Sequence, residues 1–140
     1  MPLPRIAIQE LRGIVGRDSV VDSTSDLRIF ERDGSIVGAL PDAIVLPSNA
    51  EQVAAIVNVA AKHYIPIVPR GAGTGLSGGA VTIRGGIALQ MTRLRRIIEI
   101  DTVAQTALVE PGVVNQELSR VAARAGLFYA PDPSSQRACT

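Results

Sequence analysis

Residues 68 to 80 read VPRGAGTGLSGGA, and five of the nine residues from Gly71 to Gly79 are glycine. Glycine loses more conformational freedom on ordering than any other residue, so this density does not serve packing. It lets the backbone adopt positive φ and approach a ligand closely, and successive amides of such a loop can converge on an anion. Because Arg70 adds a cation at its mouth, we expect this glycine loop to bind a diphosphate. A flexible hairpin tip is the alternative.

A strand, a helix and a second strand are predicted before the glycine loop. Residues 43 to 46 form a short apolar run that ends at a proline, which is typical of a buried strand. Ser48 and Glu51 match the ends of a capping box, and an apolar helical face follows them. Residues 65 to 68 are the second strand. The short links between these elements predict a βαβ unit with parallel strands.

The chain after the glycine loop is predicted to be largely antiparallel. Strands are expected at residues 86 to 91, 95 to 100 and 106 to 110. Residues 101 to 105 form a plausible turn between the last two strands. Asn115 is expected to cap a second helix that stops at Gly126, and a short strand follows at residues 127 to 129.

These elements predict an α+β fold, in which a small parallel βαβ unit precedes an antiparallel strand-and-helix subdomain. The main domain is expected to span residues 42 to 140. Residues 1 to 41 are interpreted as a lead-in, with an N-terminal helix that places Ile8 and Leu11 on one face and stops at Gly16. The rest of the lead-in has caps and turn formers without a sustained period, and we interpret it as a surface excursion.

Two nucleotide-binding motifs compete for the glycine loop, and both fail. A kinase or ATPase phosphate loop needs Gly-Lys-Ser/Thr after the glycines, and no Lys follows here. Residues 73 to 78 satisfy G-x-G-x-x-G, but a Rossmann site also needs a helix that starts at the third glycine. Residues 79 to 86 show no helical face, so the chain is expected to return as a strand. The anion must then be bound by loop amides without a following helix.

Composition excludes several other classes of protein. A formal net charge of +1 argues against nucleic acid as the main partner, because neutralising many phosphates needs a basic stripe. The cluster of Arg93, Arg95 and Arg96 is interpreted as solvated surface. One Cys excludes an internal disulfide, and one Cys with one His excludes a Cys/His metal cluster. The first residues are charged and lack a long apolar run, so no signal peptide or membrane span is predicted and a cytoplasmic setting is the default.

Three further segments accompany the glycine loop in a fixed order: LPSNAEQVAAIVNVA (46 to 60), VEPGVVNQEL (109 to 118) and APDPSSQRACT (130 to 140). Together the four segments resemble the FAD-binding domain of the vanillyl-alcohol oxidase and p-cresol methylhydroxylase type. The glycine loop is similar to that family's pyrophosphate loop, and the last segment to the start of its flavin-contacting segment. The resemblance covers residues 42 to 140. It is strongest to the flavin subunit of glycolate oxidase and to D-lactate and other D-2-hydroxyacid dehydrogenases.

The resemblance implies an FAD-dependent oxidoreductase or dehydrogenase that oxidises a 2-hydroxy acid such as glycolate or D-lactate. Several members of the wider family attach FAD through a His in or near the loop. No His lies between residues 64 and 140, so a non-covalent cofactor is expected. In the family the last segment continues, so we expect a truncated chain with the substrate domain and the catalytic residues outside it. The expected partners are a small-molecule substrate and an electron-transfer partner subunit or a homo-oligomer.

The resemblance also implies which residues contact the cofactor. They are Arg70, Gly71, Ala72, Gly73, Thr74, Gly75, Leu76 and Ser77, then Pro111 and Gly112, and finally Pro131, Asp132, Ser134, Cys139 and Thr140. Some roles stay open. Asp132 contacts the ligand or caps its own turn, Cys139 makes a backbone contact or fills space, and Glu110 faces the cofactor or ends a strand.

The competing hypothesis is a non-catalytic nucleotide-binding or assembly module, which fits the lack of a recognisable acid–base constellation. If the glycine loop binds the pyrophosphate of FAD, Gly75→Val is expected to weaken FAD binding through steric bulk and the loss of a positive φ. Residues 1 to 140 alone are expected to self-associate and to bind FAD weakly, because strand edges and apolar surface would be uncovered.

Overall fold

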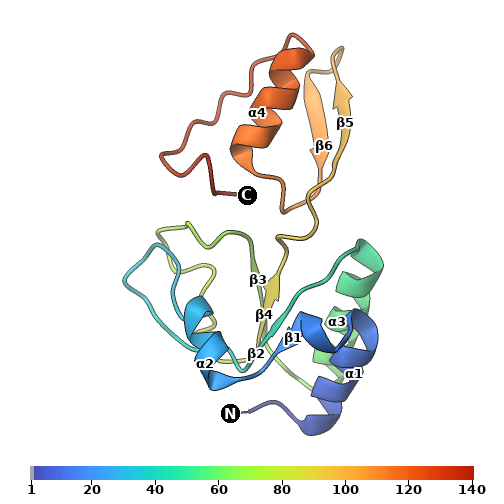
Figure 1. Ribbon diagram of the computed structural model, residues 1–140, viewed down its shortest axis with the longest axis vertical. Coiled ribbons are helices and arrows are strands. Elements are labelled where there is room, and N and C mark those ends of the chain that lie inside the picture. The colour runs from blue at the N-terminus through green and yellow to red at the C-terminus, as the bar shows by residue number, and fades with distance from the viewer. Residues whose placement is uncertain (1) are drawn as a thin grey trace.

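The computed structural model describes residues 2 to 140, and its first part is a four-stranded sheet with the order β1-β2-β4-β3 (Figure 1). The strands are β1 (Val20–Val21), β2 (Ala43–Val45), β3 (Ile67–Arg70) and β4 (Ile87–Gln90). Strands β2 and β3 both run parallel to β4, and β1 is antiparallel to β2. The parallel strands are therefore confirmed, but β4, which follows the glycine loop, is inserted between the two strands of the expected βαβ unit.

Burial explains why β4 is central and β3 lies at the edge. All four residues of β4 are buried, as in a strand covered on both faces. Strand β3 contains Pro69, which has no amide to donate to a ladder and is therefore tolerated at an edge. The prediction for this strand, residues 65 to 68, was two residues too early. The apolar run begins at Ile65, but pairing with β4 begins at Ile67.

Two helices, α1 (Arg5–Val15) and α3 (Ala50–Lys62), lie side by side on one face of the sheet (Figure 1). Leu11, Ile56 and Ile87 are completely buried in the core that the helices share with the sheet. Burying a side chain of this size stabilises the fold by about 1.5–3 kcal/mol. The predicted apolar face of the first helix is thus confirmed, and the lead-in shares the core of the sheet.

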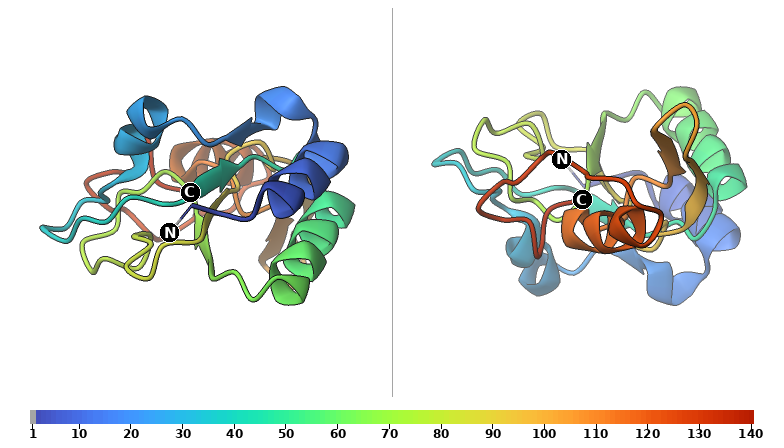
Figure 2. Two further views of the ribbon diagram at one scale, coloured as in Figure 1. Left: turned by 90° about the horizontal axis from the view of Figure 1, so that it is seen from below. Right: turned by 90° about the horizontal axis from the view of Figure 1, so that it is seen from above.

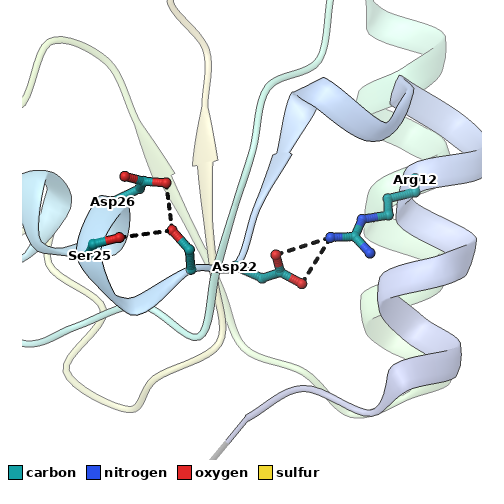
Figure 3. A network of polar contacts seen from close by, with 5 residues as sticks. Arg12, Asp22, Ser25 and Asp26 are labelled. Carbon is teal, nitrogen blue, oxygen red and sulfur yellow. Dashed lines mark hydrogen bonds and ion pairs between the residues drawn. The ribbon is translucent and has the colours of Figure 1, made fainter.

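The opposite face of the sheet carries the short helix α2 (Thr24–Leu27), whose Leu27 packs against Ile44 of β2. An ion pair between Arg12 and Asp22, 3.0 Å long, ties α1 to the segment between β1 and α2 (Figure 3). Two 3₁₀ turns complete this region, η1 (Arg17–Ser19) and η2 (Arg28–Phe30). The stretch expected to be irregular therefore contains short elements, and one of them, β1, joins the sheet.

The second part of the chain is a hairpin of β5 (Ile97–Asp101) and β6 (Thr106–Val109) beside helix α4 (Asn115–Arg124) (Figure 1). The two strands are antiparallel, as predicted. Asp101 Oδ1 closes the turn between them by accepting hydrogen bonds from two backbone amides, each 2.9 Å long. We call residues 2 to 91 the sheet lobe and residues 95 to 140 the hairpin lobe. Within residues 2 to 140, no helix has the length and apolar character needed to cross a bilayer.

Both predicted helix caps were wrong by one position. Helix α3 is capped by Asn49, whose Oδ1 accepts a hydrogen bond from the Gln52 amide at 2.8 Å, while Gln52 Oε1 accepts one from the Ser48 amide at 2.7 Å. Ser and Asn are equally good caps, so propensity could not choose between neighbours. Helix α4 is preceded by Val114, and Asn115 lies in its first turn with its amide donating to Cys139 O at 3.0 Å.

The strand predicted at residues 127 to 129 was also wrong. These residues belong to no helix or strand. The Leu127 amide donates to Ala122 O at 3.0 Å, so this segment closes the end of α4. Gly126, at φ +74°, ends the helix as expected.

Candidate diphosphate-binding site

A cavity of about 290 Å³ lies where the glycine loop of the sheet lobe faces the hairpin lobe. Figure 1 shows the same arrangement, with the C-terminal end turned toward the loops above the sheet. Eleven residues line the cavity: Pro69, Arg70, Gly71, Ala72, Gly73, Thr74, Gly75, Ala80, Met91, Pro111 and Thr140. The structure thus brings together most of the predicted glycine-loop contacts with two predicted contacts from the hairpin lobe.

The backbone amides of the glycine loop, residues 71 to 79, make no hydrogen bond to any residue from 2 to 140. Such amides are the donors that an anion-binding loop offers to phosphate oxygens. The chain then returns as β4 without an intervening helix, as predicted, so these amides are the donors of this site.

Positive φ occurs at only some of the loop glycines. Gly73 has φ +71° and Gly78 has φ +74°, which is the left-handed region where glycine is favoured. The expectation of a positive φ at Gly75 was wrong, and a Cβ atom placed on Gly75 would meet open space. A side chain at Gly73 would instead collide with the guanidinium of Arg70. Gly73 is therefore required by the fold of the loop, whereas Gly75 leaves room at the cavity.

Two buried side chains hold the two ends of the glycine loop from below. Arg70 ends β3 and Gln90 ends β4, and the two residues are paired in the parallel ladder. Gln90 Nε2 donates to Gly71 O at 3.0 Å, at the start of the loop. Arg70 Nη1 donates to Ala80 O at 3.2 Å, just after its last glycine. The loop is thus fixed at both ends by donors from adjacent strands.

The guanidinium of Arg70 makes further contacts beneath the loop. Arg70 is only 7% exposed, its Nη2 donates to Arg32 O at 2.7 Å, and its Cζ lies 5.5 Å from the centre of the Phe30 ring. Burial lowers the pKa of Arg70 below its usual range, and the charge of Asp33 opposes that change. Arg70 lines the cavity, but its contact with a cofactor stays a prediction.

A segment that the sequence suggested was a surface excursion forms a wall beside the glycine loop. Figures 1 and 2 show residues 30 to 38 running alongside it. A Cβ on Gly34 would lie 2.9 Å from Gly75 O, so only glycine allows this approach of the two backbones. Asp33 Oδ2 accepts a long hydrogen bond, 3.5 Å, from the Ala80 amide, and hydrogen bonds from Ser35 lower the pKa of Asp33. No local sequence pattern predicts this contact between residues 30 to 38 and the glycine loop.

The entry to the hairpin lobe is held by an ion pair and a tight turn. Glu110 accepts hydrogen bonds from the backbone and side chain of Arg96, 2.7 and 2.9 Å long, which lower the pKa of Glu110. Glu110 therefore closes the hairpin, and together with Cys139 and Thr140 it also lines a second cavity next to the one at the glycine loop. The next residue, Pro111, lines the cavity at the glycine loop, whereas Gly112 is buried and its amide donates to Leu94 O at 2.7 Å.

All three arginines of the predicted surface cluster are exposed, and two of them also make polar contacts within the protein. Arg96 pairs with Glu110, as described. Arg93 Nη1 donates to Ser19 Oγ at 2.7 Å and to Leu46 O at 3.4 Å, which ties the link between the lobes to the sheet lobe. Arg95 is exposed, and it makes no hydrogen bond or ion pair with any residue from 2 to 140.

The C-terminal segment divides into residues at the cavity and residues away from it. Thr140 touches Gly71, and Cys139 lines a neighbouring cavity of about 190 Å³ that shares Pro111 and Thr140. The Cys139 carbonyl accepts a hydrogen bond from the Asn115 amide, so the backbone of Cys139 holds the C-terminal segment against the start of α4. Pro131 and Asp132 instead line a separate cavity of about 340 Å³ against α4.

Three other predicted contacts, Leu76, Ser77 and Ser134, are exposed and do not line the cavity at the glycine loop. Three residues that sequence reasoning missed do line it: Pro69, Ala80 and Met91. Pro69 and Ala80 flank the glycines, so counting the flanks as part of the site would have found them. Met91 follows β4, and only the insertion of β4 beside β3 places it there.

Comparison with known proteins locates the chain within a family. The profile of the family described as FAD binding domain matches residues 41 to 140. The chain is 42% identical over 134 residues to the glycolate oxidase subunit GlcD of Escherichia coli (strain K12), a match that covers 95% of this chain and 27% of that protein. It is 35% identical over 126 residues to D-lactate dehydrogenase of Anaerostipes hadrus, covering 89% of this chain and 25% of that protein.

Among solved structures, p-cresol methylhydroxylase with substrate bound matches with a TM-score of 0.79 and 27% sequence identity. That match covers 91% of this chain and 27% of the other. The chain thus spans about a quarter of the length of the proteins that it resembles.

Proposed function

This chain belongs to the FAD binding domain family, and on that premise we propose that the amides of residues 71 to 77 hold the diphosphate of FAD. The observation that supports this proposal is the absence of any internal acceptor for those amides in the described chain, at residues that mostly line one cavity. A cavity of about 290 Å³ suits the diphosphate and its immediate surroundings rather than a whole dinucleotide. The rest of FAD then extends past Pro111 and Thr140 toward the adjoining cavity at Cys139.

The residues of this chain bind and orient the cofactor in this proposal. Loop amides donate to the phosphate oxygens, while Pro111 and Thr140 approach the same cavity from the hairpin lobe. Bound FAD supplies the redox chemistry by accepting a hydride equivalent from a substrate. Cofactor contacts by Pro131, Asp132 and Ser134 are proposed only for a cofactor that extends along α4, since these residues lie away from the glycine loop.

The wider activity is proposed from the relatives. The names of the similar proteins, glycolate oxidase subunit and D-lactate dehydrogenase, support a 2-hydroxy acid as the substrate of the whole oxidoreductase. FAD is proposed to be non-covalent, because no His lies between residues 64 and 140. We further propose a cytoplasmic protein that works as a homo-oligomer or with an electron-transfer partner subunit, as the word subunit in one relative's name suggests.

A matched pair of glycine substitutions tests the proposed diphosphate site. Gly75 lines the cavity and Gly79 does not, yet a Cβ would meet open space at both and neither has a positive φ. Neither Gly75→Val nor Gly79→Val should therefore strain the backbone or create a steric clash in the ligand-free protein. We expect Gly75→Val to weaken FAD binding about tenfold or more, and Gly79→Val to change it less than threefold, with similar thermal midpoints.

Titration of the full-length protein with FAD, followed by flavin fluorescence, measures both dissociation constants, and NAD is the comparison ligand. Equal losses at Gly75 and Gly79 would place the diphosphate elsewhere. A protein that binds NAD and ignores FAD would contradict the proposed function altogether.

A further inference from the structure

The two ends of the glycine loop are tied to a rigid frame before any ligand is present. Arg70 and Gln90 are each 7% exposed, and each ends a strand of the sheet. Arg70 donates to Ala80 O, just after the loop, at 3.2 Å, and Gln90 donates to Gly71 O, the first carbonyl of the loop, at 3.0 Å. Their pairing in the ladder between β3 and β4 fixes the distance between these anchors.

Arg70 also ties the loop to the wall formed by residues 30 to 38. One terminal nitrogen donates to Ala80 O and the other to Arg32 O. The guanidinium carbon lies 5.5 Å from the centre of the Phe30 ring, and a Cβ on Gly73 would collide with the guanidinium. Two acceptors in different segments are thus held by one planar fork. Lysine has the same charge but no such fork, so it cannot hold both acceptors in this geometry.

We propose that Arg70 and Gln90 are positioning residues, which hold the glycine loop in its binding shape, and that Arg70 acts through the loop rather than by contacting a phosphate. This inference rests on the proposed function in one respect, namely that the loop binds FAD. Ordering the loop in advance removes an entropy cost from binding, so loss of the anchors weakens FAD binding although neither side chain contacts the ligand.

The variants Arg70→Lys and Arg70→Gln separate positioning from charge, and the exposed Arg95→Gln is the matched control. In the full-length protein we expect both Arg70 variants to weaken FAD binding by about tenfold or more, within about threefold of each other, because neither can replace the two charge-assisted hydrogen bonds. Arg95→Gln is expected to leave the dissociation constant unchanged. Wild-type affinity in Arg70→Lys, together with a loss in Arg70→Gln, would show that charge alone matters and would overturn the proposal.

Backbone ¹⁵N relaxation of the ligand-free protein provides the readout that does not depend on FAD, since order parameters report loop motion even for amides without an acceptor. We expect lower order parameters for residues 71 to 80 in both Arg70 variants, with unchanged values in α3. Unchanged order parameters in the loop would overturn the proposed anchoring. A wild-type protein that failed to bind FAD, but whose variants showed the lower order parameters, would refute the proposed function and support the anchoring.

The other anchor keeps the proposal testable if the Arg70 variants do not fold. Gln90→Met has a similar volume and removes the donor to Gly71 O without changing any charge. We expect the same two effects, weaker FAD binding and lower ¹⁵N order parameters at the start of the loop. A folded Gln90→Met protein with wild-type values for both would overturn the role of Gln90.

Discussion

The sheet lobe and the hairpin lobe face the same cavity but are built differently. In the sheet lobe, α1, α3 and the strands enclose one continuous apolar core. In the hairpin lobe only Val113, Leu118 and Ala122 are buried apolar residues, while Ile98, Val103, Leu108 and Phe128 are exposed. The hairpin lobe therefore depends on turns, an ion pair and one helix for its shape. From this difference we expect the hairpin lobe to be more easily displaced than the sheet lobe, which carries the glycine loop.

The largest effect is expected from the core of the sheet lobe. Ile56 of α3 is completely buried, so Ile56→Ala should destabilise the protein by about 2–5 kcal/mol through lost burial and a cavity. Leu108 of β6 is 57% exposed, and Leu108→Ala should change stability by less than about 1 kcal/mol. Denaturant unfolding of both variants measures the two values. Equal losses would mean that the lobes are equally well packed, against the comparison drawn here.

A smaller effect is expected where the hairpin lobe joins the sheet lobe. A Cβ on Gly112 would lie 2.5 Å from Met91 O and 2.6 Å from Leu94 O, and backbone atoms cannot move aside cheaply. Gly112→Ala should therefore destabilise the protein by about 1–3 kcal/mol and speed hydrogen exchange in the hairpin lobe more than in the sheet lobe.

Gly13→Ala is the control for that change. A Cβ would meet open space at Gly13 in α1, where alanine is the better helix former by up to about 1 kcal/mol. If Gly112→Ala were as well tolerated as Gly13→Ala, the close approach of residues 91 to 94 to the hairpin lobe would be wrong.

A pH-dependent effect is expected from the ion pair that closes the hairpin. The hydrogen bond from the Arg96 side chain is the main cause of the lowered pKa of Glu110, whose ordinary value is 4.5. The contribution of the pair is therefore present above about pH 4.5 and is lost as the pH falls through the lowered pKa of the folded protein. Arg96 is largely exposed, so the effect should be small.

The measurement is the thermal midpoint of wild type and Glu110→Gln from pH 7 to pH 3. We expect wild type to be more stable at pH 7 and the gap to close in acid. Glu10 and Asp33 also have lowered pKa values and make stability depend on pH. Because both proteins contain these residues, their contribution cancels in the difference between the two midpoints. A gap that persisted at pH 3 would contradict the role of the Glu110 carboxylate.

The smallest effect on stability is expected at the exposed apolar side chains of the hairpin lobe. We expect the 140-residue chain to self-associate through the surface that includes Leu108 and Phe128. Leu108→Ser should reduce this association and leave the thermal midpoint within about 2 °C, since the side chain is mostly exposed. Sedimentation velocity over a range of protein concentrations decides this, and a wild-type chain that stays monomeric would contradict it.

Features that depend on local sequence patterns could be predicted, whereas features that depend on contacts between distant residues could not. The glycine loop and the antiparallel hairpin depend on local patterns, and both were confirmed as elements of the structure. The central position of β4 could not be predicted, because strand order depends on contacts across the whole sheet. The anchoring of Arg70 to Arg32 O joins residues 38 positions apart, for which the sequence shows no pattern.

Local choices between neighbours failed for a related reason. Ser48 and Asn49 have the same capping preference, and only the start of α3 decides between them. The Gly75 carbonyl closely approaches Gly34 in the neighbouring wall, a contact between residues far apart in sequence that no local pattern indicates. The wall of residues 30 to 38 does lie at the surface, as expected, but its contact with the glycine loop could not be identified without the fold.

The central claim is that the amides of residues 71 to 77 donate to the diphosphate of FAD. Two-dimensional ¹H–¹⁵N NMR of the labelled protein during a titration with FAD observes those amides directly. We predict large downfield shifts for Gly73 and Gly75, because their protons gain phosphate acceptors, and small shifts for the amides of β5 and β6. Saturation with FAD that leaves the amides of residues 71 to 79 unchanged, or shifts confined to the hairpin lobe, would contradict the claim.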